Sequence, residues 1–258
     1  MKKIKLISVI CLISIFFSLI SFDAFSMCEY SWYCKRSGRK QPALTKEERL
    51  ISAYSGYSID RSVDDNSERK VIYITFDCGY ENGNVSKILD TLEEENVPAA
   101  FFLLDNIILK NADLVTRMAS AGHLVCNHTK NHKNLSSASK EEISENLLAL
   151  EKIYEDKIGR KMSKYFRFPE GRYSEEALKS VSELGYKTIF WSFAYDDWDN
   201  SRQMCTEKAI NKILNNTHNG AVMLFHPTSR VNACIMPQLI AEWRKMGYTF
   251  GTLDELTA

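Results

Sequence analysis

The sequence predicts an α/β fold, a (β/α) barrel of parallel strands that is distorted or incomplete. Apolar runs alternate regularly with amphipathic helical stretches from Val71 to the end of the 258-residue chain. Polar clusters follow directly after the predicted strands, as in barrels that carry their chemistry at the carboxyl ends of the strands. No glycine-rich dinucleotide motif follows the first strand, which disfavours an open doubly wound sheet.

The predicted strands are short apolar runs rich in β-branched and aromatic residues. Residues 71–76 are almost entirely apolar, as expected of a strand that is buried on both faces. The other predicted strands occupy residues 99–104, 123–127, 165–168, 188–193 and 221–225, and residues 249–253 close the chain.

The predicted helices lie between these strands. Asn84 is expected to cap a helix with apolar residues on one face. Ser139 and Glu142 have the spacing of a capping box for a helix that runs to about residue 157. Ser174 precedes a helix that ends at Gly185. Further helices are expected at about residues 112–120, 206–215 and 236–246.

Residues 1–26 have the pattern of a secretory signal peptide. Three lysines lie within the first five residues, residues 6–20 are apolar, and Ala24-Phe25-Ser26 offers a cleavage site. The apolar run is short for a membrane span, so cleavage is favoured over an uncleaved anchor. We therefore expect an exported protein of the cell envelope or the extracellular space, with no stable membrane anchor after cleavage.

The remaining chain divides into an N-terminal extension, residues 27–68, and one catalytic domain, residues 69–258. The extension is polar but contains aromatic residues that can pack onto the domain: Tyr30, Trp32, Tyr33 and Tyr54. The chain is 45% hydrophobic with a formal net charge of zero, which suits one globular domain and disfavours a nucleic-acid partner. We expect a monomer.

Six of the seven cysteines would remain after cleavage, an even number that permits disulfides in an exported protein. Cys28 and Cys34 are a candidate pair, whereas Cys205 and Cys234 can pair only if the fold brings them together. The alternative is that several of the cysteines are buried free thiols.

Five short motifs together supply the groups that metal-assisted amide hydrolysis requires. Each motif alone is weak, but their order and spacing along the chain form a strong signal. The motifs are Thr-Phe-Asp-Cys-Gly at 75–79, His-Thr-Lys-Asn-His at 128–132, Arg-Phe-Pro-Glu-Gly at 167–171, Asp-Trp at 197–198 and Leu-Phe-His at 224–226.

The first two motifs suggest a general base and a metal site. Asp77 follows a buried strand and is a candidate base, although a turn carboxylate is the alternative. His128 and His132 are four residues apart, which would place both imidazoles on one face of a helical turn and allow them to bind one divalent cation. The alternative for this pair is two solvated histidines in a polar loop.

The other motifs suggest groups that orient or donate protons. Arg167 ends a strand and can hold Asp77 ionised, unless it is a surface arginine at the rim of the barrel. Asp197 and His226 follow the next two strands and can pair, with His226 as the acid that protonates the leaving nitrogen. The alternative is that His226 simply packs at a strand end.

From residue 71 to its end, the chain resembles the polysaccharide deacetylases of carbohydrate esterase family 4, which share the NodB-homology domain. It is most similar to the delta-lactam-biosynthetic de-N-acetylases, which act on muramic acid in the spore cortex. The segments that carry this resemblance are Thr-Phe-Asp-Cys-Gly-Tyr-Glu-Asn-Gly at 75–83 and His-Pro-Thr-Ser-Arg-Val-Asn-Ala at 226–233. The resemblance implies a distorted βα barrel.

The resemblance also implies roles for individual residues. Asp77 would be the base, with Arg167 orienting it. His226 would be the acid, with Asp197 orienting it. His128 and His132 would bind the metal.

By the same resemblance, Leu224 and Trp198 would line the pocket for the acetyl group. The backbone N–H of Glu170 would help to hold the oxyanion. Glu170 replaces the usual aromatic residue of the family, and Ala194 stands where many members have an acidic residue.

Cys78 stands where most family members carry a metal-binding aspartate. A thiolate ligand at this position would favour zinc. Alternatively Cys78 is a bystander and water takes its place, or the site binds metal weakly. We favour the bystander, because the delta-lactam subgroup tolerates a non-acidic residue there. One divalent cation is expected, with zinc first and manganese, magnesium or cobalt as alternatives.

The expected function is removal of N-acetyl groups from N-acetylmuramic acid in peptidoglycan glycan strands. Arg230 is the one cation in residues 229–233 and could pair with the lactyl carboxylate of muramic acid. One alternative is an N-acetylglucosamine deacetylase of peptidoglycan or chitin-like polymers, and another is a catalytically dead glycan-binding module. Glycoside hydrolysis is disfavoured, because its pair of carboxylates does not need the histidine pair.

Overall fold

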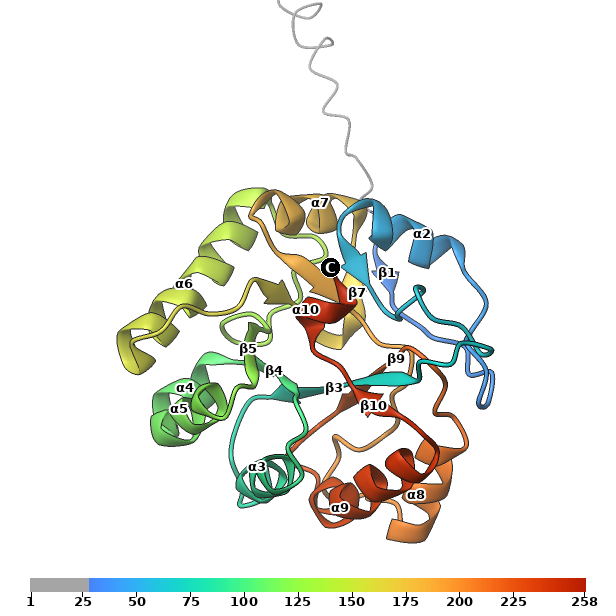
Figure 1. Cartoon of the computed structure of the whole chain (residues 1–258). Coiled ribbons are helices and arrows are strands. Elements are labelled where there is room, and N and C mark those ends of the chain that lie inside the picture. The colour runs from blue at the N-terminus through green and yellow to red at the C-terminus, as the bar shows by residue number, and fades with distance from the viewer. Residues whose placement is uncertain (1–27) are drawn as a thin grey trace, which may run out of the picture.

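The computed structural model describes residues 28–258, so the predicted signal peptide lies outside the described residues. Helices surround a central sheet (Figure 1). The strands are β1 Tyr30–Ser31, β2 Gly56–Tyr57, β3 Val71–Cys78, β4 Ala100–Leu103, β5 Leu124–Asn127, β6 Tyr165–Phe166, β7 Arg172–Tyr173, β8 Lys187–Ile189, β9 Ala221–Phe225 and β10 Thr249–Phe250. The helices are α2 Lys46–Ala53, α3 Val85–Glu94, α4 Asp105–Lys110, α5 Ala112–Ser120, α6 Lys140–Ile158, α7 Glu175–Glu183, α8 Thr206–Leu214, α9 Arg230–Lys245 and α10 Leu253–Leu256, with a 3₁₀ turn at Pro169–Gly171.

The main sheet is parallel throughout and has the order β10-β3-β4-β5-β6-β8-β2, with β9 paired to β3. The chain just after β8 bonds to β9: Ser192 N–H donates to the Val222 carbonyl at 3.0 Å, and Leu224 N–H donates to the Phe193 carbonyl at 2.9 Å. The sheet therefore curls back on itself. This arrangement confirms the predicted distorted (β/α) barrel.

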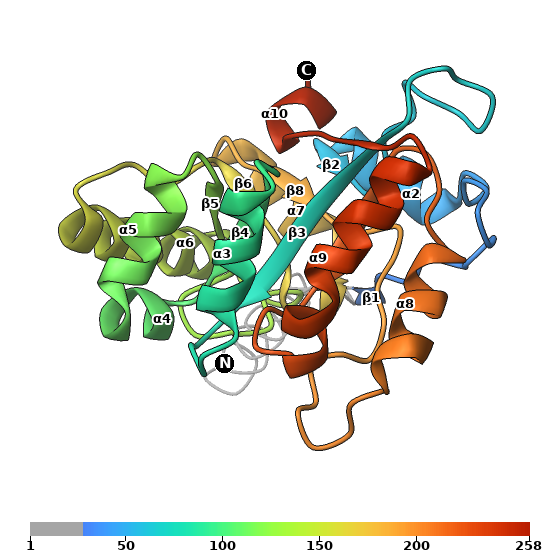
Figure 2. The ribbon, with the colours of Figure 1, turned by 60° about the horizontal axis from the view of Figure 1, so that its bottom comes forward.

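Side chains along β3 point alternately to the outer and the inner side of the barrel wall. Ile74, Phe76 and Cys78 belong to the large core under the surrounding helices, whereas Val71 and Tyr73 face the barrel interior. The short helix α10 contributes Leu253 and Leu256 to that interior core, so it closes one end of the barrel. Figure 2 shows α10 at the end opposite the one toward which β3 runs.

Residues 28–68 are integrated into the barrel. Strand β2 pairs with β8 in the main sheet, and β1 pairs with β7 in a two-stranded sheet. Helix α2 is capped by Thr45, and its Glu48 forms a two-pronged ion pair with Arg61 at 2.7 Å. The predicted extension thus contributes a strand and a helix to the barrel.

Several local predictions were confirmed and others were wrong. Ser139 and Glu142 form the predicted capping box, and Ser174 caps α7. Asn84 occupies the predicted N-cap position of α3, but its side chain makes no capping bond; the carboxylate of Glu81 accepts from Val85 N–H at 3.0 Å instead. Helix α9 begins at Arg230, six residues before its predicted start, and α4 was not predicted.

Two further features of residues 28–258 concern the pairing of the cysteines and the length of the helices. The six cysteines of residues 28–258 are all unpaired, so neither candidate disulfide is formed. Among the helices of this range, none is both long and apolar enough to span a bilayer.

Candidate active site

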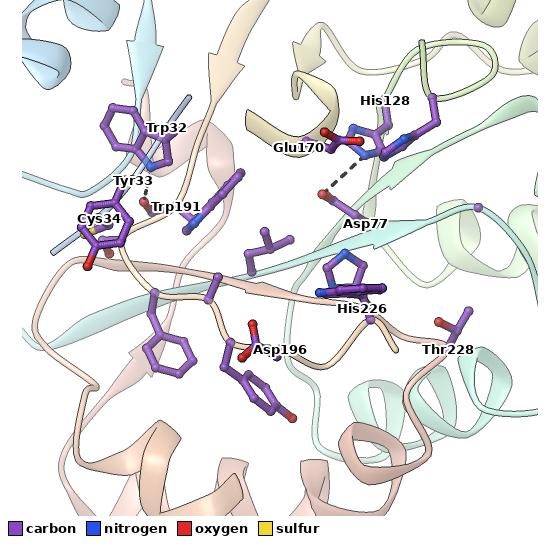
Figure 3. Close-up of a pocket in the computed structure, with 18 of the residues that line it drawn as sticks. Trp32, Tyr33, Cys34, Asp77, His128, Glu170, Trp191, Asp196, His226 and Thr228 are labelled. Atoms are coloured by element: carbon purple, nitrogen blue, oxygen red, sulfur yellow. Dashed lines mark hydrogen bonds and ion pairs between the residues drawn. The ribbon is translucent and has the colours of Figure 1, made fainter. Parts of the chain in front are cut away.

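The motif residues meet around one large cavity at the open end of the barrel. The cavity has a volume of about 1140 Å³, and loops after β3, β5, β6, β8 and β9 line it together with the N-terminal segment. Figure 3 shows Asp77, His128, Glu170 and His226 on one side of this cavity and Trp32, Tyr33 and Cys34 on the other. A ligand pocket usually has a volume of about 300–1000 Å³, so this cavity has room for more than a small ligand.

The carboxylate of Asp77 is held by a fully buried arginine. Arg167 Nη1 donates to Asp77 Oδ1 at 2.7 Å, and the other guanidinium nitrogens bond to the carbonyls of Ile189 and Phe190 and to Thr75. Burial alone would raise the pKa of the Asp77 carboxyl, but Arg167 and then His128 hold it below its usual value. Asp77 is therefore an ionised base with limited access to solvent.

The two histidines meet through a loop, so the predicted helical turn was wrong. Thr129 and His132 adopt left-handed backbone conformations, with φ of 71° and 59°. The side chain of Asn127 holds the loop by accepting from Thr129 N–H at 2.9 Å. The rings of His128 and His132 consequently lie 5.1 Å apart, at an interplanar angle of 73°.

His128 is arranged so that one ring nitrogen is available to a cation. Its Nδ1 lies 2.9 Å from the Arg167 carbonyl, which can only accept, so Nδ1 carries the proton. Its Nε2 therefore has a free lone pair and lies 3.5 Å from Asp77 Oδ2. Burial lowers the pKa of the imidazole to about 4, which keeps it neutral. Fixing the second nitrogen in this way is typical of metal-binding histidines.

The imidazoles of His128 and His132 fit a divalent cation that keeps its other coordination positions open. Within residues 28–258, no three His, Cys, Asp or Glu side chains form a complete ligand group. A catalytic site commonly leaves positions for water and substrate, so His128 and His132 can serve as an incomplete set.

Cys78 does not belong to this set. Its side chain is buried among the core residues under the helices, outside the cavity lining. Burial raises the pKa of the thiol well above its usual value, so it is neutral. The location of its side chain therefore favours the bystander over the thiolate ligand.

The second predicted pair is His226 with Asp197, and His226 lines the same cavity as Asp77. His226 Nδ1 donates to Asp197 Oδ1 at 2.7 Å, and the His226 backbone N–H donates to Asp197 Oδ2 at 2.8 Å. Burial alone would lower the pKa of His226, but Asp197 raises it above its usual value. The pKa of His226 is thus raised while that of Asp77 is lowered, and a pair with opposed pKa shifts suits acid–base work.

Asn232 is a positioning residue to which sequence analysis gave no role. Its amide donates to Asp197 Oδ2 at 2.6 Å and to the His226 carbonyl at 3.1 Å, and its oxygen accepts from Tyr195. The only sequence signal was its place in the segment 226–233. The burial of a polar residue in the first turn of α9 becomes visible only in the structure.

Three further predicted residues line the cavity: Leu224 is buried, Trp198 is 62% exposed, and Glu170 lies at the rim. Glu170 has a left-handed backbone, with φ of 57°. A Cβ at the next residue, Gly171, would lie 2.8 Å from the Trp191 ring and 3.0 Å from Trp32 Cβ. Glycine is therefore required for the close approach of this turn to both tryptophans.

Arg230 is not brought into the cavity with the other predicted site residues, so its contact with substrate stays a prediction. It is an exposed residue at the start of α9 and is absent from the cavity lining. The structure instead brings residues 32–36 of the N-terminal segment into the cavity wall, which sequence analysis missed. Their aromatic residues predict packing onto the domain, but not where, because their partners are distant along the chain.

Comparison with known proteins identifies the family of the chain. Residues 64–189 match the family described as Polysaccharide deacetylase. The chain is 35% identical over 229 residues to the peptidoglycan-N-acetylmuramic acid deacetylase PdaA of Bacillus subtilis, covering 88% of this chain and 85% of that protein. It is 30% identical over 195 residues to a peptidoglycan-N-acetylglucosamine deacetylase of Bacillus cereus, covering 74% of this chain and 89% of that protein.

A solved structure extends the likeness to three dimensions. The structure of Bacillus subtilis PdaA, described as a family 4 carbohydrate esterase, matches with a TM-score of 0.82 and 33% identity. The match covers 88% of this chain and 96% of that one. The chain therefore belongs to the polysaccharide deacetylase family, carbohydrate esterase family 4, and is a hydrolase of carbon–nitrogen bonds other than peptide bonds.

Proposed function

We propose that this protein is an exported, metal-dependent peptidoglycan deacetylase that removes the N-acetyl group of N-acetylmuramic acid. The observation that carries the proposal is that Asp77, bonded to Arg167, and His226, bonded to Asp197, line one cavity beside His128 and His132. The name of the Bacillus subtilis relative supports muramic acid as the sugar, because that protein is 35% identical over most of this chain.

The reaction is hydrolysis of an amide. Asp77 takes a proton from the attacking water as the water oxygen bonds to the acetyl carbon. His226 Nε2 gives its proton to the sugar nitrogen as the carbon–nitrogen bond breaks, so acetate and a free amine leave. Arg167 keeps Asp77 ionised, and Asp197 keeps the His226 ring oriented and protonated.

A divalent cation bound by His128 and His132 would polarise the amide carbonyl and make the water more acidic. Zinc suits two neutral imidazoles, with manganese, magnesium and cobalt as alternatives. The backbone N–H of Glu170 and the walls formed by Leu224 and Trp198 would receive the acetyl group and its developing negative charge.

The proposal extends to organisation and location. Residues 1–26 would be a cleaved signal peptide, residues 27–68 would complete the cavity, and residues 69–258 would carry the catalytic groups. The monomeric protein would act on peptidoglycan glycan strands in the cell envelope, on the spore-cortex side of the membrane. Formation of muramic delta-lactam requires the amine that this reaction produces.

The main alternative substrate is N-acetylglucosamine, since a relative that is 30% identical carries that sugar in its name. The chemistry would be the same, and only the fit of the sugar in the cavity would differ. A glycan-binding module without activity is less well supported, because both acid–base pairs are intact at hydrogen-bonding distance.

Acetate release distinguishes these alternatives. Peptide-free glycan strands and chitin oligomers are incubated separately with the mature, metal-loaded protein. Faster release from the glycan strands supports the proposal, and equal or faster release from chitin oligomers promotes N-acetylglucosamine. A protein that binds strands but releases no acetate from either substrate would be a binding module.

A further inference from the structure

We propose that Lys35 and Arg36 form a cationic subsite that binds the lactyl carboxylate of muramic acid. This inference deepens the proposed function and rests on it. It replaces the role that the sequence suggested for Arg230, which lies outside the cavity. Lys35 and Arg36 are the only lysine or arginine among the residues that line the cavity in the described chain.

The position of this subsite is fixed by Trp32. Its backbone N–H donates to the Gly171 carbonyl at 2.8 Å, and its indole N–H donates to the Trp191 carbonyl at 2.8 Å. Its ring packs against Phe190 with centroids 4.7 Å apart. The N-terminal segment is thereby attached to the loops that carry the catalytic residues. Figure 3 shows Trp32 bonded to Trp191 on the side of the cavity opposite Asp77.

Arg36 is anchored but has unused hydrogen-bonding capacity. One guanidinium nitrogen donates to the Ala194 carbonyl at 2.8 Å, and the group lies 5.8 Å from the centre of the Phe193 ring. These contacts orient the guanidinium, and its other N–H groups make no bond within residues 28–258. Several other exposed arginines are already paired with carboxylates, among them Arg61, Arg172 and Arg244.

The charges around the cavity select where a carboxylate can lie. Asp77, Glu170 and Asp196 line it and would repel a second carboxylate near them. Lys35 and Arg36 attract one, and a guanidinium matches carboxylate geometry with two parallel hydrogen bonds. Muramic acid carries this carboxylate when no peptide is attached, and N-acetylglucosamine lacks it. The subsite therefore favours peptide-free muramic acid over N-acetylglucosamine.

The test compares charged and neutralised strands. Peptide-free glycan strands are used as such, or with their lactyl carboxylates converted to methylamides, and chitin oligomers serve as the third substrate. The variants are K35Q, R36Q and the double variant. R36K retains the charge, and K40Q removes an exposed lysine of the same segment that does not line the cavity. Acetate release gives kcat and KM, and calorimetry gives affinity.

We expect the double variant to lose about 10-fold or more in kcat/KM on charged strands, mostly through KM, because a hydrogen bond to a charged group is strong but partly screened here. Methylamidated strands and chitin oligomers should be hydrolysed at unchanged rates. R36K should retain part of the preference for charged strands over methylamidated strands, and K40Q should retain all of that preference. High salt should weaken the wild-type preference.

Unchanged kcat/KM and affinity of the double variant on charged strands would overturn the inference while leaving the deacetylase proposal intact. An equal loss on methylamidated strands would also overturn it, because the residues would then act without regard to charge. A further variant, R230Q, tests the start of α9. If R230Q lost the preference for charged strands and the Lys35 and Arg36 variants kept it, the carboxylate would bind at α9 and the inference would be overturned. A wild-type protein that releases no acetate from muramic acid refutes the proposed function itself.

Discussion

Replacing Asp197 with asparagine should slow the reaction and move the alkaline limb of its pH profile to lower pH. The carboxylate is buried and accepts three hydrogen bonds, two from His226 and one from Asn232. An amide of the same shape offers a single oxygen, so at least one donor loses its charged acceptor. A hydrogen bond to a charged group contributes about 1.5–3 kcal/mol, and about 1.4 kcal/mol changes a rate tenfold. We therefore expect kcat to fall about 10–100-fold.

The direction of the pH effect follows from the role of His226. The imidazole must be protonated to donate to the leaving nitrogen, so activity is lost as the pH rises through its pKa. Asp197 raises that pKa, and its removal lowers the pH at which activity is lost. The assay is kcat/KM for acetate release across the neutral and alkaline range, which reports the free enzyme.

The matched control is Asp199→Asn, because the carboxylate of Asp199 bonds only to Ser201 in its own turn. This variant should follow the wild-type profile. An Asp197→Asn profile that superimposes on the wild type, with kcat unchanged, would refute the assignment of His226 as an acid supported by Asp197.

Three other predictions concern stability, metal and substrate. Replacing Arg167 with methionine leaves the Asp77 carboxylate buried without its partner and should cost about 3–5 kcal/mol of unfolding free energy in urea titration; an unchanged midpoint would contradict the pairing. The double variant His128→Ala, His132→Ala should retain no divalent metal by elemental analysis after dialysis. A metal content equal to that of the wild type would show that these histidines do not bind the metal. Replacing the exposed Trp198 with alanine should raise KM for glycan strands without altering the unfolding midpoint, and an unchanged KM would exclude it from the substrate pocket.

The barrel could be predicted because its signals are local. Strands β3 and β9 are continuous apolar runs, and the capping box at Ser139 and the Ser174 cap mark the starts of α6 and α7. The start of α9, predicted at about residue 236, was wrong by six residues. In the structure Ser229 caps the helix, accepting from Asn232 N–H at 3.1 Å, and Pro237 lies inside it.

The candidate site was predictable in its residue types but not in its backbone. The i, i+4 spacing of His128 and His132 also occurs in helices, so it cannot reveal a loop with two left-handed residues. That loop is held by the buried Asn127, whose amide bonds to Leu147 in α6. Such tertiary contacts override local preference.

The N-terminal wall of the cavity could not be predicted because its contacts are long-range. Trp32 bonds to Trp191, 159 residues away, and Arg36 bonds to Ala194, 158 residues away. A tryptophan in a polar segment predicts packing somewhere, but not against the loops beside the active site. For the same reason the sequence pointed to Arg230, which is close to His226 along the chain, and did not point to Arg36.

The most direct test of the account is mass spectrometry of peptide-free glycan strands after incubation with the mature, metal-loaded protein. Fragmentation locates each lost acetyl group on one of the two alternating sugars. The account predicts loss from muramic acid and no loss in the His226→Ala variant. Loss from N-acetylglucosamine in place of muramic acid, or equal loss with the His226→Ala variant, would contradict it.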